Sequence, residues 1–430
     1  MQFSTMRVIV PRAAAVFVLS LLALTCSSRA EDWPRWKGVR GDGTWNGPEL
    51  PAGWPAEGLV PVWKQPIGPG YSGISVASGR VYTMDRTKAA AEGRTTAGGE
   101  RVLCWEAATG KALWQYTYEA DYKGLDYDKG PRCTPTVADG RVYALGSVGH
   151  LHCLDAKTGS VLWSKDFVKD HGAELPMWGF SCSPVIDGKL VILHAGLKPG
   201  GCYVAYDRIT GEEVWRGGDD PLGYGTPIII EHNQTRQLIG WTPENVVALR
   251  ISDGKPLWKI PYKVTYGVSI ATPVFHEGIV LVCGYWEGSK AIKLGSRPDD
   301  AGILWEENRF LRGLMDPPLY RDGHGYLLDK QHGIVGFKWS DGQKLWTDEN
   351  RLTPRGRNPQ VSLVWLGNSD RAIALNSQGE LILVRLTPAG LEEQSRAKIV
   401  GETWAHPAYA GNHAFARDDN QIVCIKLTGK

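Results

Sequence analysis

The chain has 430 residues, of which 48 are basic and 46 acidic, so its net charge is +2 at neutral pH. This balance, with no basic run interleaved with aromatic residues, argues against capture of nucleic acid or of an anionic membrane surface. The 18 Trp and 52 Gly are high counts, which indicates a fold that uses tryptophan for packing and glycine for turns.

Residues 1–30 have the order of a signal peptide: basic residues, an apolar run over 13–24, and small residues before a cleavage point at Ala30. The apolar run is too short to span a bilayer comfortably. We therefore predict an exported protein, periplasmic or extracellular, cleaved after Ala30 and without a later transmembrane segment. A lipoprotein attached through Cys26 is the less favoured alternative, because Thr25 is a poor fit to the small residue that such processing prefers.

Residues 31–61 form an arm that is rich in Gly, Pro and Trp and shows no alternating pattern. We expect this arm to lie across the outside or one face of the domain that follows. Four tryptophans in it need burial, and packing is favoured over a binding role for them. They are Trp33, Trp36, Trp45 and Trp54.

The domain after the arm is built from a repeated unit, which is clearest in residues 133–163. Tight turns such as Asp139-Gly140 separate its apolar segments. One small four-stranded sheet cannot bury both of its faces, so each unit needs neighbours. The four strands of this unit are predicted at 136–138, 141–145, 151–154 and 161–163.

A tryptophan near the end of each unit recurs every 41–52 residues. A period of about 40–50 residues with four strands per unit is typical of a β-propeller. The recurring tryptophans are Trp63, Trp114, Trp163, Trp215, Trp258, Trp305 and Trp346.

Residues 62–430 divide into eight units, which predicts an all-β, eight-bladed β-propeller of four-stranded antiparallel blades. The last unit, 404–427, lacks a fourth strand, whereas Val62-Trp63 reads as a strand with no unit before it. We predict that this N-terminal strand completes the last blade and closes the ring, which removes two exposed sheet edges. The seventh unit, 361–394, has lost its tryptophan, and a seven-bladed ring is the alternative if the last two units merge.

Seven cysteines remain after cleavage, an odd number that leaves at least one thiol free unless it bonds to another chain. Equivalent positions on adjacent blades should lie about 10 Å apart, which is too far for a disulfide. We therefore interpret five of the cysteines as buried apolar residues. These are Cys104, Cys153 and Cys424 in the third strands, and Cys133 and Cys182 before the first strands.

The segment 205–215, AYDRITGEEVW, resembles the tryptophan-docking repeat A-x-D-x-x-T-G-x-E-x-W of pyrroloquinoline-quinone (PQQ) propellers. The resemblance covers nearly the whole mature chain, and the arm motif Trp33-Pro34-Arg35-Trp36 resembles the opening of exported bacterial PQQ-like repeat proteins. It implies that each tryptophan wedges between adjacent blades while the Asp and Thr-Gly shape the turn. These roles are packing roles, so the motif indicates a fold and not a chemistry.

The resemblance leaves three kinds of function open. One branch of the family contains the quinoprotein alcohol and sugar dehydrogenases, with PQQ and Ca²⁺ on the propeller axis. A second branch is non-catalytic, such as the propeller lipoprotein of the outer-membrane β-barrel assembly machine. A third consists of uncharacterised exported proteins, and this chain looks most like those.

Two motifs of the catalytic branch are missing from the sequence. The alcohol dehydrogenases carry two adjacent cysteines, and haem-bearing relatives carry C-x-x-C-H, and neither pattern occurs here. Calcium needs a cluster of oxygen ligands. The candidates Asp316, Asn358 and Glu402 stand singly near blade openings. The sequence also lacks G-x-S-x-G, H-E-x-x-H and P-loop motifs, and a surface or turn role is favoured over metal binding for His150 and His152.

Propeller geometry predicts one place for a ligand, because the segments that enter the innermost strands converge on the axis at one face. This set is rich in aromatic residues and would suit a planar anionic ligand through stacking and bidentate contacts. The alternative is that these side chains only plug the channel. The predicted ligand-binding residues are Tyr71, Arg132, Trp178, Tyr224, Asp316, Asn358, Trp404 and His406, and Ser72, Phe180, Ser269 and Arg357 complete the set.

The sequence therefore favours an exported PQQ-like repeat protein that acts as a non-catalytic binding or scaffold module in the cell envelope. No catalytic residue and no cofactor is predicted for this function, and its metal content stays open. Its partner would be an envelope protein or a small, planar or anionic ligand, and not nucleic acid. The alternative is a PQQ-dependent quinoprotein oxidoreductase of the alcohol or sugar dehydrogenase type, with PQQ and calcium as cofactors.

Overall fold

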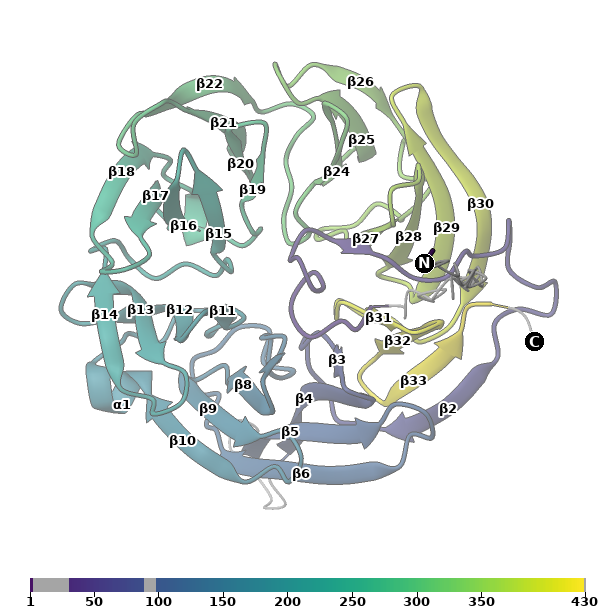
Figure 1. Ribbon diagram of the computed structural model, residues 1–430, viewed down its shortest axis with the longest axis horizontal. Coiled ribbons are helices and arrows are strands. Elements are labelled where there is room, and N and C mark those ends of the chain that lie inside the picture. Colours follow the sequence, from purple (N-terminus) through teal and green to yellow (C-terminus); the bar gives the residue numbers. More distant parts are fainter. Residues whose placement is uncertain (3–30, 89–97, 429–430) are drawn as a thin grey trace.

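The computed structural model of the chain describes residues 1–2, 31–88 and 98–428. Within these residues, eight four-stranded antiparallel units are set around a central axis (Figure 1). This arrangement confirms the predicted all-β propeller with eight blades, and the seven-bladed alternative is wrong. Residues 3–30, which hold most of the predicted signal segment and Cys26, lie outside the described residues.

The first four blades run from the axis outwards in chain order. In each blade the first strand lies innermost and the fourth lies at the rim (Figure 1). Blade 1 contains β3 (Ser75–Ala77), β4 (Arg80–Lys88), β5 (Gly98–Glu106) and β6 (Ala112–Glu119). Blade 2 contains β7 (Thr136–Ala138), β8 (Arg141–Leu145), β9 (His150–Asp155) and β10 (Val161–Asp166). Blade 3 contains β11 (Val185–Asp187), β12 (Leu190–Leu197), β13 (Gly201–Asp207) and β14 (Glu213–Gly217). Blade 4 contains β15 (Ile228–His232), β16 (Thr235–Trp241), β17 (Asn245–Arg250) and β18 (Pro256–Pro261).

The last four blades repeat this order, and the final one borrows a strand from the beginning of the chain. Blade 5 contains β19 (Val274–His276), β20 (Ile279–Gly284), β21 (Gly288–Leu294) and β22 (Ala301–Glu307). Blade 6 contains β23 (Leu319–Arg321), β24 (His324–Asp329), β25 (Gly333–Lys338) and β26 (Lys344–Thr347). Blade 7 contains β27 (Val361–Leu366), β28 (Arg371–Asn376), β29 (Glu380–Thr387) and β30 (Gly390–Lys398). Blade 8 contains β31 (Ala408–Ala410), β32 (His413–Arg417), β33 (Gln421–Lys426) and β2 (Pro61–Pro66).

The loops between blades all reach one face of the ring, which we call the entry face because each loop there leads into an innermost strand. Two short helices lie in these loops, α1 (Phe167–His171) and η1 (Thr265–Gly267). No helix within the described part of the chain is long and apolar enough to cross a membrane. The entry-face segments are 67–74, 120–135, 167–184, 218–227, 262–273, 308–318, 348–360 and 399–407.

The predicted hairpin chemistry of blade 2 is confirmed. Asp139 and Gly140 both have positive φ, 45° and 74°, as a tight turn between two twisted strands requires. β7 and β8 have the predicted bounds, whereas β10 continues to Asp166, three residues beyond the prediction. The extension arises because residues after Trp163 keep pairing with β9, which a pattern of apolar residues does not reveal.

Six of the seven recurring tryptophans link each blade to the next. Their indole N–H groups donate to a backbone carbonyl of the following blade at 2.8–3.2 Å, as Trp63 does to Ala107. In five of these pairs the ring lies on the glycine of the next blade's turn. A Cβ on that glycine would be only 2.5–2.7 Å from the ring, so a glycine is needed at this position for the contact. The glycines are Gly110, Gly159, Gly211, Gly254 and Gly342.

Two places in the ring depart from this pattern. Trp258 donates instead to the Gln237 side chain of its own blade, at 3.2 Å. In blade 7 the register position of the docking tryptophan belongs to Ser395, which lies opposite Leu383. Trp54 of the arm covers this position: its backbone N–H donates to Ser395 Oγ at 2.9 Å, and its indole N–H donates to Leu381 O at 3.1 Å.

The ring is closed as predicted by the strand that follows the arm. β2 pairs antiparallel with β33, and Trp63 lies opposite Cys424. Arg417 of β32 also links blade 8 to blade 1. Its guanidinium donates to the backbone carbonyls of Met84 and Gly68, both at 2.6 Å. Complete burial lowers the pKa of Arg417 to about 10, although the charges of Asp85, Asp419 and Asp418 oppose that shift. Blade 8 thus joins the two ends of the chain.

The interpretation of the cysteines as buried apolar residues is confirmed. All seven cysteines within the described residues are buried and unbridged. Cys104, Cys153 and Cys424 lie in the third strands, as predicted. Burial raises the pKa of the Cys104 thiol to about 11, so this thiol stays protonated at neutral pH.

Ring closure predicts that two neighbouring residues of β2 differ greatly in how much their replacement by alanine lowers the free energy of unfolding. Trp63 is 8 % exposed and docks on blade 1, whereas Val62 is 49 % exposed. We expect Trp63→Ala to lower the free energy of unfolding by about 3–5 kcal/mol through loss of packing and a cavity. Val62→Ala should change it by no more than about 0.5 kcal/mol. Equilibrium denaturation in urea measures both, and equal effects would contradict the closure role of Trp63.

Candidate functional site

The first half of the arm runs through the centre of the propeller, and not across its outside or one face as expected (Figure 1, purple). The backbone of Trp33 pairs with Val76 of β3 at 2.8 and 2.9 Å, and Pro34 O accepts from Val137 N of β7 at 2.8 Å. Strand β1 (Thr44–Trp45) then adds to β27 in parallel. The arm therefore occupies the inner edges of blades 1, 2 and 7.

The arm tryptophans pack as the sequence analysis favours. Trp33, Trp45 and Trp54 are buried in one cluster with residues of blades 1, 7 and 8. Trp36 is half-buried, and its indole N–H donates to Thr272 Oγ1 of the loop before blade 5 at 2.9 Å. The first half of the arm thus belongs to the centre of the ring. Its second half lies across the outside of blade 7, as expected, because Trp54 packs on the outer strand β30.

A buried ion pair lies beside the axis, where the arm meets blades 6 and 7. Lys37 Nζ is 2.8 Å from Asp316 Oδ1, and it also donates to Leu363 O at 2.9 Å. The second carboxylate oxygen, Asp316 Oδ2, accepts from Leu363 N at 3.1 Å. Burial raises the pKa of Asp316, and the charge of Lys37 opposes that rise. Both oxygens of this predicted site residue are therefore already engaged.

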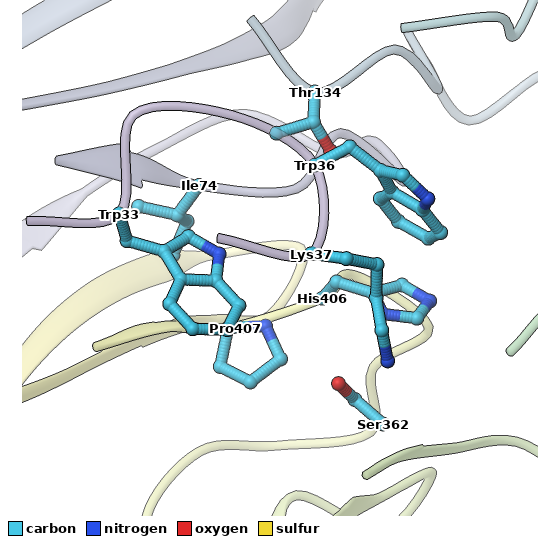
Figure 2. Close-up of a pocket in the computed structure, with 8 residues that line it drawn as sticks. All are labelled: Trp33, Trp36, Lys37, Ile74, Thr134, Ser362, His406 and Pro407. Carbon is cyan, nitrogen blue, oxygen red and sulfur yellow. The ribbon is translucent and has the colours of Figure 1, made fainter. Parts of the chain in front are cut away.

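His406 and Trp36 complete the filling of the axis (Figure 2). Their ring centroids are 4.3 Å apart, and His406 Nδ1 is 3.6 Å from Asp316 Oδ1. Burial, and then the charge of Lys37, hold the pKa of His406 well below its ordinary value, so the ring is neutral. The cavity volume left among these side chains is about 0 Å³. Its walls are Trp33, Trp36, Lys37, Ile74, Thr134, Ser362, His406 and Pro407.

A second group of predicted residues gathers on the entry face. The rings of Tyr71 and Trp404 are 5.6 Å apart, and the Arg132 guanidinium lies 5.5 Å from the Tyr71 ring. Asn358 joins them through Tyr127, since Asn358 Nδ2 donates to Tyr127 Oη at 3.0 Å and the Tyr127 ring is 5.7 Å from Trp404. The structure thus brings four predicted residues together, with Tyr127 as a member that sequence analysis missed.

Tyr127 was missed because its segment, 121–130, reads as a polar surface loop. Its aspartates and lysines favour a solvated loop, and no local pattern reveals that the loop folds back over Trp404. The remaining aromatic pair, Trp178 and Tyr224, has ring centroids 5.3 Å apart and forms a separate contact. Phe180, Ser72 and Ser269 are buried, and so do not line the entry face.

Arg132 is held by the protein itself. Its two terminal nitrogens donate to the carbonyls of Gly130, Asp126 and Tyr127 and to Ser147 Oγ, at 2.7–3.0 Å. Burial lowers the pKa of this guanidinium. Its fork therefore fixes the loop that carries Tyr127, and it does not present a free bidentate face to a ligand.

The residues of the axis and the entry face do not fit calcium. Asp316 is saturated by Lys37 and Leu363 N–H, Asn358 bonds to Tyr127, and Glu402 is exposed. Among the described residues, no group of three or more His, Cys, Asp or Glu side chains could hold a metal ion. A planar quinone would also need an open slot, and the space around Lys37 and His406 has none.

The His150 and His152 pair is part of an aromatic cluster. His152 is 5 % exposed, and its ring centroid lies 4.3 Å from that of Tyr118 and 5.0 Å from that of Tyr116. Burial, and then the charge of His150, lower the pKa of His152 to about 3. Blades 1 and 2 thus use this histidine as a neutral packing residue, and the expected surface or turn role is wrong for it.

The axial ion pair predicts an asymmetric response to mutation. Removal of one partner leaves the other charge buried and unpaired, so Lys37→Met should lower the free energy of unfolding by about 3–5 kcal/mol. The double variant Lys37→Met/Asp316→Asn should recover part of this loss, because no buried charge remains. Equilibrium denaturation of the single and double variants measures the coupling. Wild-type stability in Lys37→Met would contradict the pairing.

The chain is similar in sequence to a family of propeller proteins and to quinoprotein alcohol dehydrogenases. The family model described as outer membrane protein assembly factor BamB matches residues 60–147 and 101–308, together more than half of the chain. A quinohemoprotein alcohol dehydrogenase, ADH-IIG of Pseudomonas putida, is 33% identical over 130 residues, which are 28% of this chain and 17% of that protein. The quinoprotein alcohol dehydrogenase PedH of P. putida is 26% identical over 239 residues, 53% of this chain and 35% of that protein. The chain thus matches well under two thirds of the length of these relatives.

Solved structures show the same architecture. BamB from Moraxella catarrhalis superposes with a TM-score of 0.59 at 16% identity, covering 86% of this chain and 98% of that chain. Quinohemoprotein alcohol dehydrogenase from Comamonas testosteroni superposes with a TM-score of 0.62 at 15% identity, covering 93% and 81%. Identities this low show the fold alone. With the tryptophan-docked blades and the family match over residues 60–308, the chain belongs to the PQQ-like propeller family described as outer membrane protein assembly factor BamB.

Proposed function

We propose that this chain is a non-catalytic binding or scaffold module of the cell envelope that recognises a protein partner through its entry face. The observation that carries the proposal is the filled pocket beside the axis, where the arm meets blades 6 and 7. The chain's own arm occupies the centre of the ring, where Lys37 neutralises Asp316 and a cavity volume of about 0 Å³ remains. The loops around the axis carry exposed aromatic side chains suited to recognition, and exposed aliphatic residues also lie on the outer strands, such as Leu162 and Leu304.

The entry face carries large exposed apolar and aromatic residues on three of its loops and on one hairpin. Tyr127 is 42 % exposed, Met177 54 %, Tyr266 75 %, and Trp286, in the β20–β21 hairpin, 47 %. Lys330 places its ammonium 4.4 Å from the Trp286 ring, which holds that ring in place. Aromatic residues and methionine are enriched where proteins bind one another, because they bury much area at small entropic cost.

Two observations support an envelope location. The order of residues 1–30 is that of a signal peptide. The family model is described as an outer membrane protein assembly factor. A propeller suits this role, because its rigid ring displays loops from several blades on one surface without needing a chemical site.

The partner-binding role predicts where a covalent crosslinker captures protein. A photo-reactive benzoylphenylalanine should be introduced as Trp286→benzoylphenylalanine and, separately, as Tyr127→benzoylphenylalanine, and the protein exported in its own host. We expect both positions to give an adduct with the same envelope protein on irradiation. Val161 at the rim is the matched control, because it is 43 % exposed but lies on the outer strand β10. Equal capture from position 161, or none from 127 and 286, would contradict the proposal.

The second candidate is a PQQ-dependent oxidoreductase of the alcohol or sugar dehydrogenase type. The specific observation in its favour is sequence identity of 33% with a quinohemoprotein alcohol dehydrogenase over 130 residues. The engaged carboxylate of Asp316 is the observation against it.

A titration of the purified protein with PQQ and Ca²⁺ separates the two candidates. We expect no saturable quenching of tryptophan fluorescence at PQQ concentrations of about 100 μM, because the pocket around Lys37 and His406 is filled and Asp316 is neutralised. Dye reduction should likewise fail with a panel of alcohols and sugars, assayed beside a quinoprotein dehydrogenase as positive control. Saturable binding with substrate-dependent dye reduction would overturn the scaffold proposal.

A further inference from the structure

A cavity of about 260 Å³ lies on the side of the axis that the arm leaves open. One wall is the arm, through Arg35 and Trp36, and the other is the inner edge of blades 3 and 4, through β11 and β15. The cavity extends to the ends of these strands that lie opposite the entry face, where Asp187 and Arg236 line it. It is separate from the filled pocket around Lys37 and from the partner surface proposed above.

The side chain of Arg35 is the cation that this cavity leaves without an acidic partner. Its Nε and Nη2 both donate to Val39 O, at 3.1 and 2.9 Å, which anchors the guanidinium against the arm. No carboxylate oxygen within the described residues lies within 4.0 Å of it. Burial lowers the pKa of this guanidinium, and the charge of Asp42 opposes the effect. A half-buried guanidinium with an unused terminal nitrogen is a site for an anion.

The other two arginines of the cavity differ from Arg35 in this respect. Arg40 pairs with Glu31 at 2.7 Å, and Arg236 pairs with Asp187. Their charges are therefore neutralised by the protein. Glu231 of β15 also lines the cavity as an exposed carboxylate, so Arg35 is the unpaired positive charge beside the Trp36 ring and the walls as a whole carry no net positive charge. One such charge matches a monoanion.

The opposite wall offers free backbone edges. In this molecule the inner edges of three blades already receive extended chain, since β1 adds to β27, Trp33 pairs with Val76, and Pro34 O accepts from Val137 N. The described arm residues make no such backbone bond to β11 or β15, which stand at the ends of their sheets. An inner edge that faces a cavity can accept another extended segment in the same way.

We propose that this cavity binds the carboxyl-terminal end of an extended peptide, with its terminal carboxylate on Arg35 and its backbone along the free edge of β11 or β15. The apolar side chains of Ile186 and Ile228 and the ring of Trp36 would contact the last side chains of the peptide. This combination of an edge strand with a carboxylate-binding cation suits a peptide terminus better than a free small acid, which would use Arg35 alone.

The test uses N-acetyl-Ala-Val-Ala with a free carboxylate and the same peptide as its carboxyl-terminal amide. Calorimetric titration of the purified protein should give saturable binding of the acid. The amide should bind at least about tenfold more weakly, because a charge-assisted hydrogen bond is lost. Arg35→Met should abolish the preference for the acid. Arg297→Met is the matched control, because Arg297 is an exposed arginine in a turn of blade 5 and pairs with Asp299; it should leave the preference unchanged.

Two further measurements show where the peptide binds and whether the Arg35→Met variant is folded. Binding should shift the ¹⁵N indole resonance of Trp36, which is assigned by its loss in Trp36→Phe, and circular dichroism should show Arg35→Met folded. Arg35→Lys retains the charge and should keep part of the preference. Equal affinity for acid and amide, absence of binding at millimolar peptide, or butyrate binding as tightly as the peptide would each overturn the proposal. None of these outcomes depends on the entry-face partner.

Discussion

The contact between a tryptophan of one blade and a turn of the next is the interaction on which the ring depends. In six of the eight blades the indole donates to a carbonyl of the next blade, and in five of these pairs it also lies against a glycine, so these blades are held at a set distance from their neighbours. A single sheet of this size cannot bury both faces, and the stacked blades bury them for one another. The contact tolerates no side chain at the glycine, which explains why a glycine recurs in the turn that receives the tryptophan.

The exception in blade 7 follows from the same constraint. Blade 8 takes its fourth strand from the beginning of the chain, so no hairpin turn exists there to receive a tryptophan from blade 7. Ser395 stands at the docking position instead, and Trp54 covers it from the arm. Trp54 of the arm therefore covers the position at which the other blades carry a docking tryptophan.

The arm links the fold to the question of function. Its passage along the inner edges of blades 1, 2 and 7 places Lys37 beside Asp316 and fills the axis there, while the edges of blades 3 and 4 stay free around Arg35. The family described as BamB shares its propeller with quinoprotein dehydrogenases, so the ring alone does not specify chemistry. In this chain the arm decides which parts of the channel are filled and which stay open.

The sequence by itself determined the number of blades, the four-stranded unit, the docking tryptophans and the closing strand, because all of these follow from local turn chemistry and a repeat of 41–52 residues. It also identified Tyr71, Arg132, Asn358 and Trp404 as neighbours, since each occupies an equivalent loop. Only the tertiary structure decided that Tyr127 joins them, that Asp316 and His406 lie under the arm, and that Arg35 borders a cavity. Those contacts join residues as far apart in the chain as Lys37 and Asp316, and an arm without a repeat carries no periodic pattern to predict its path.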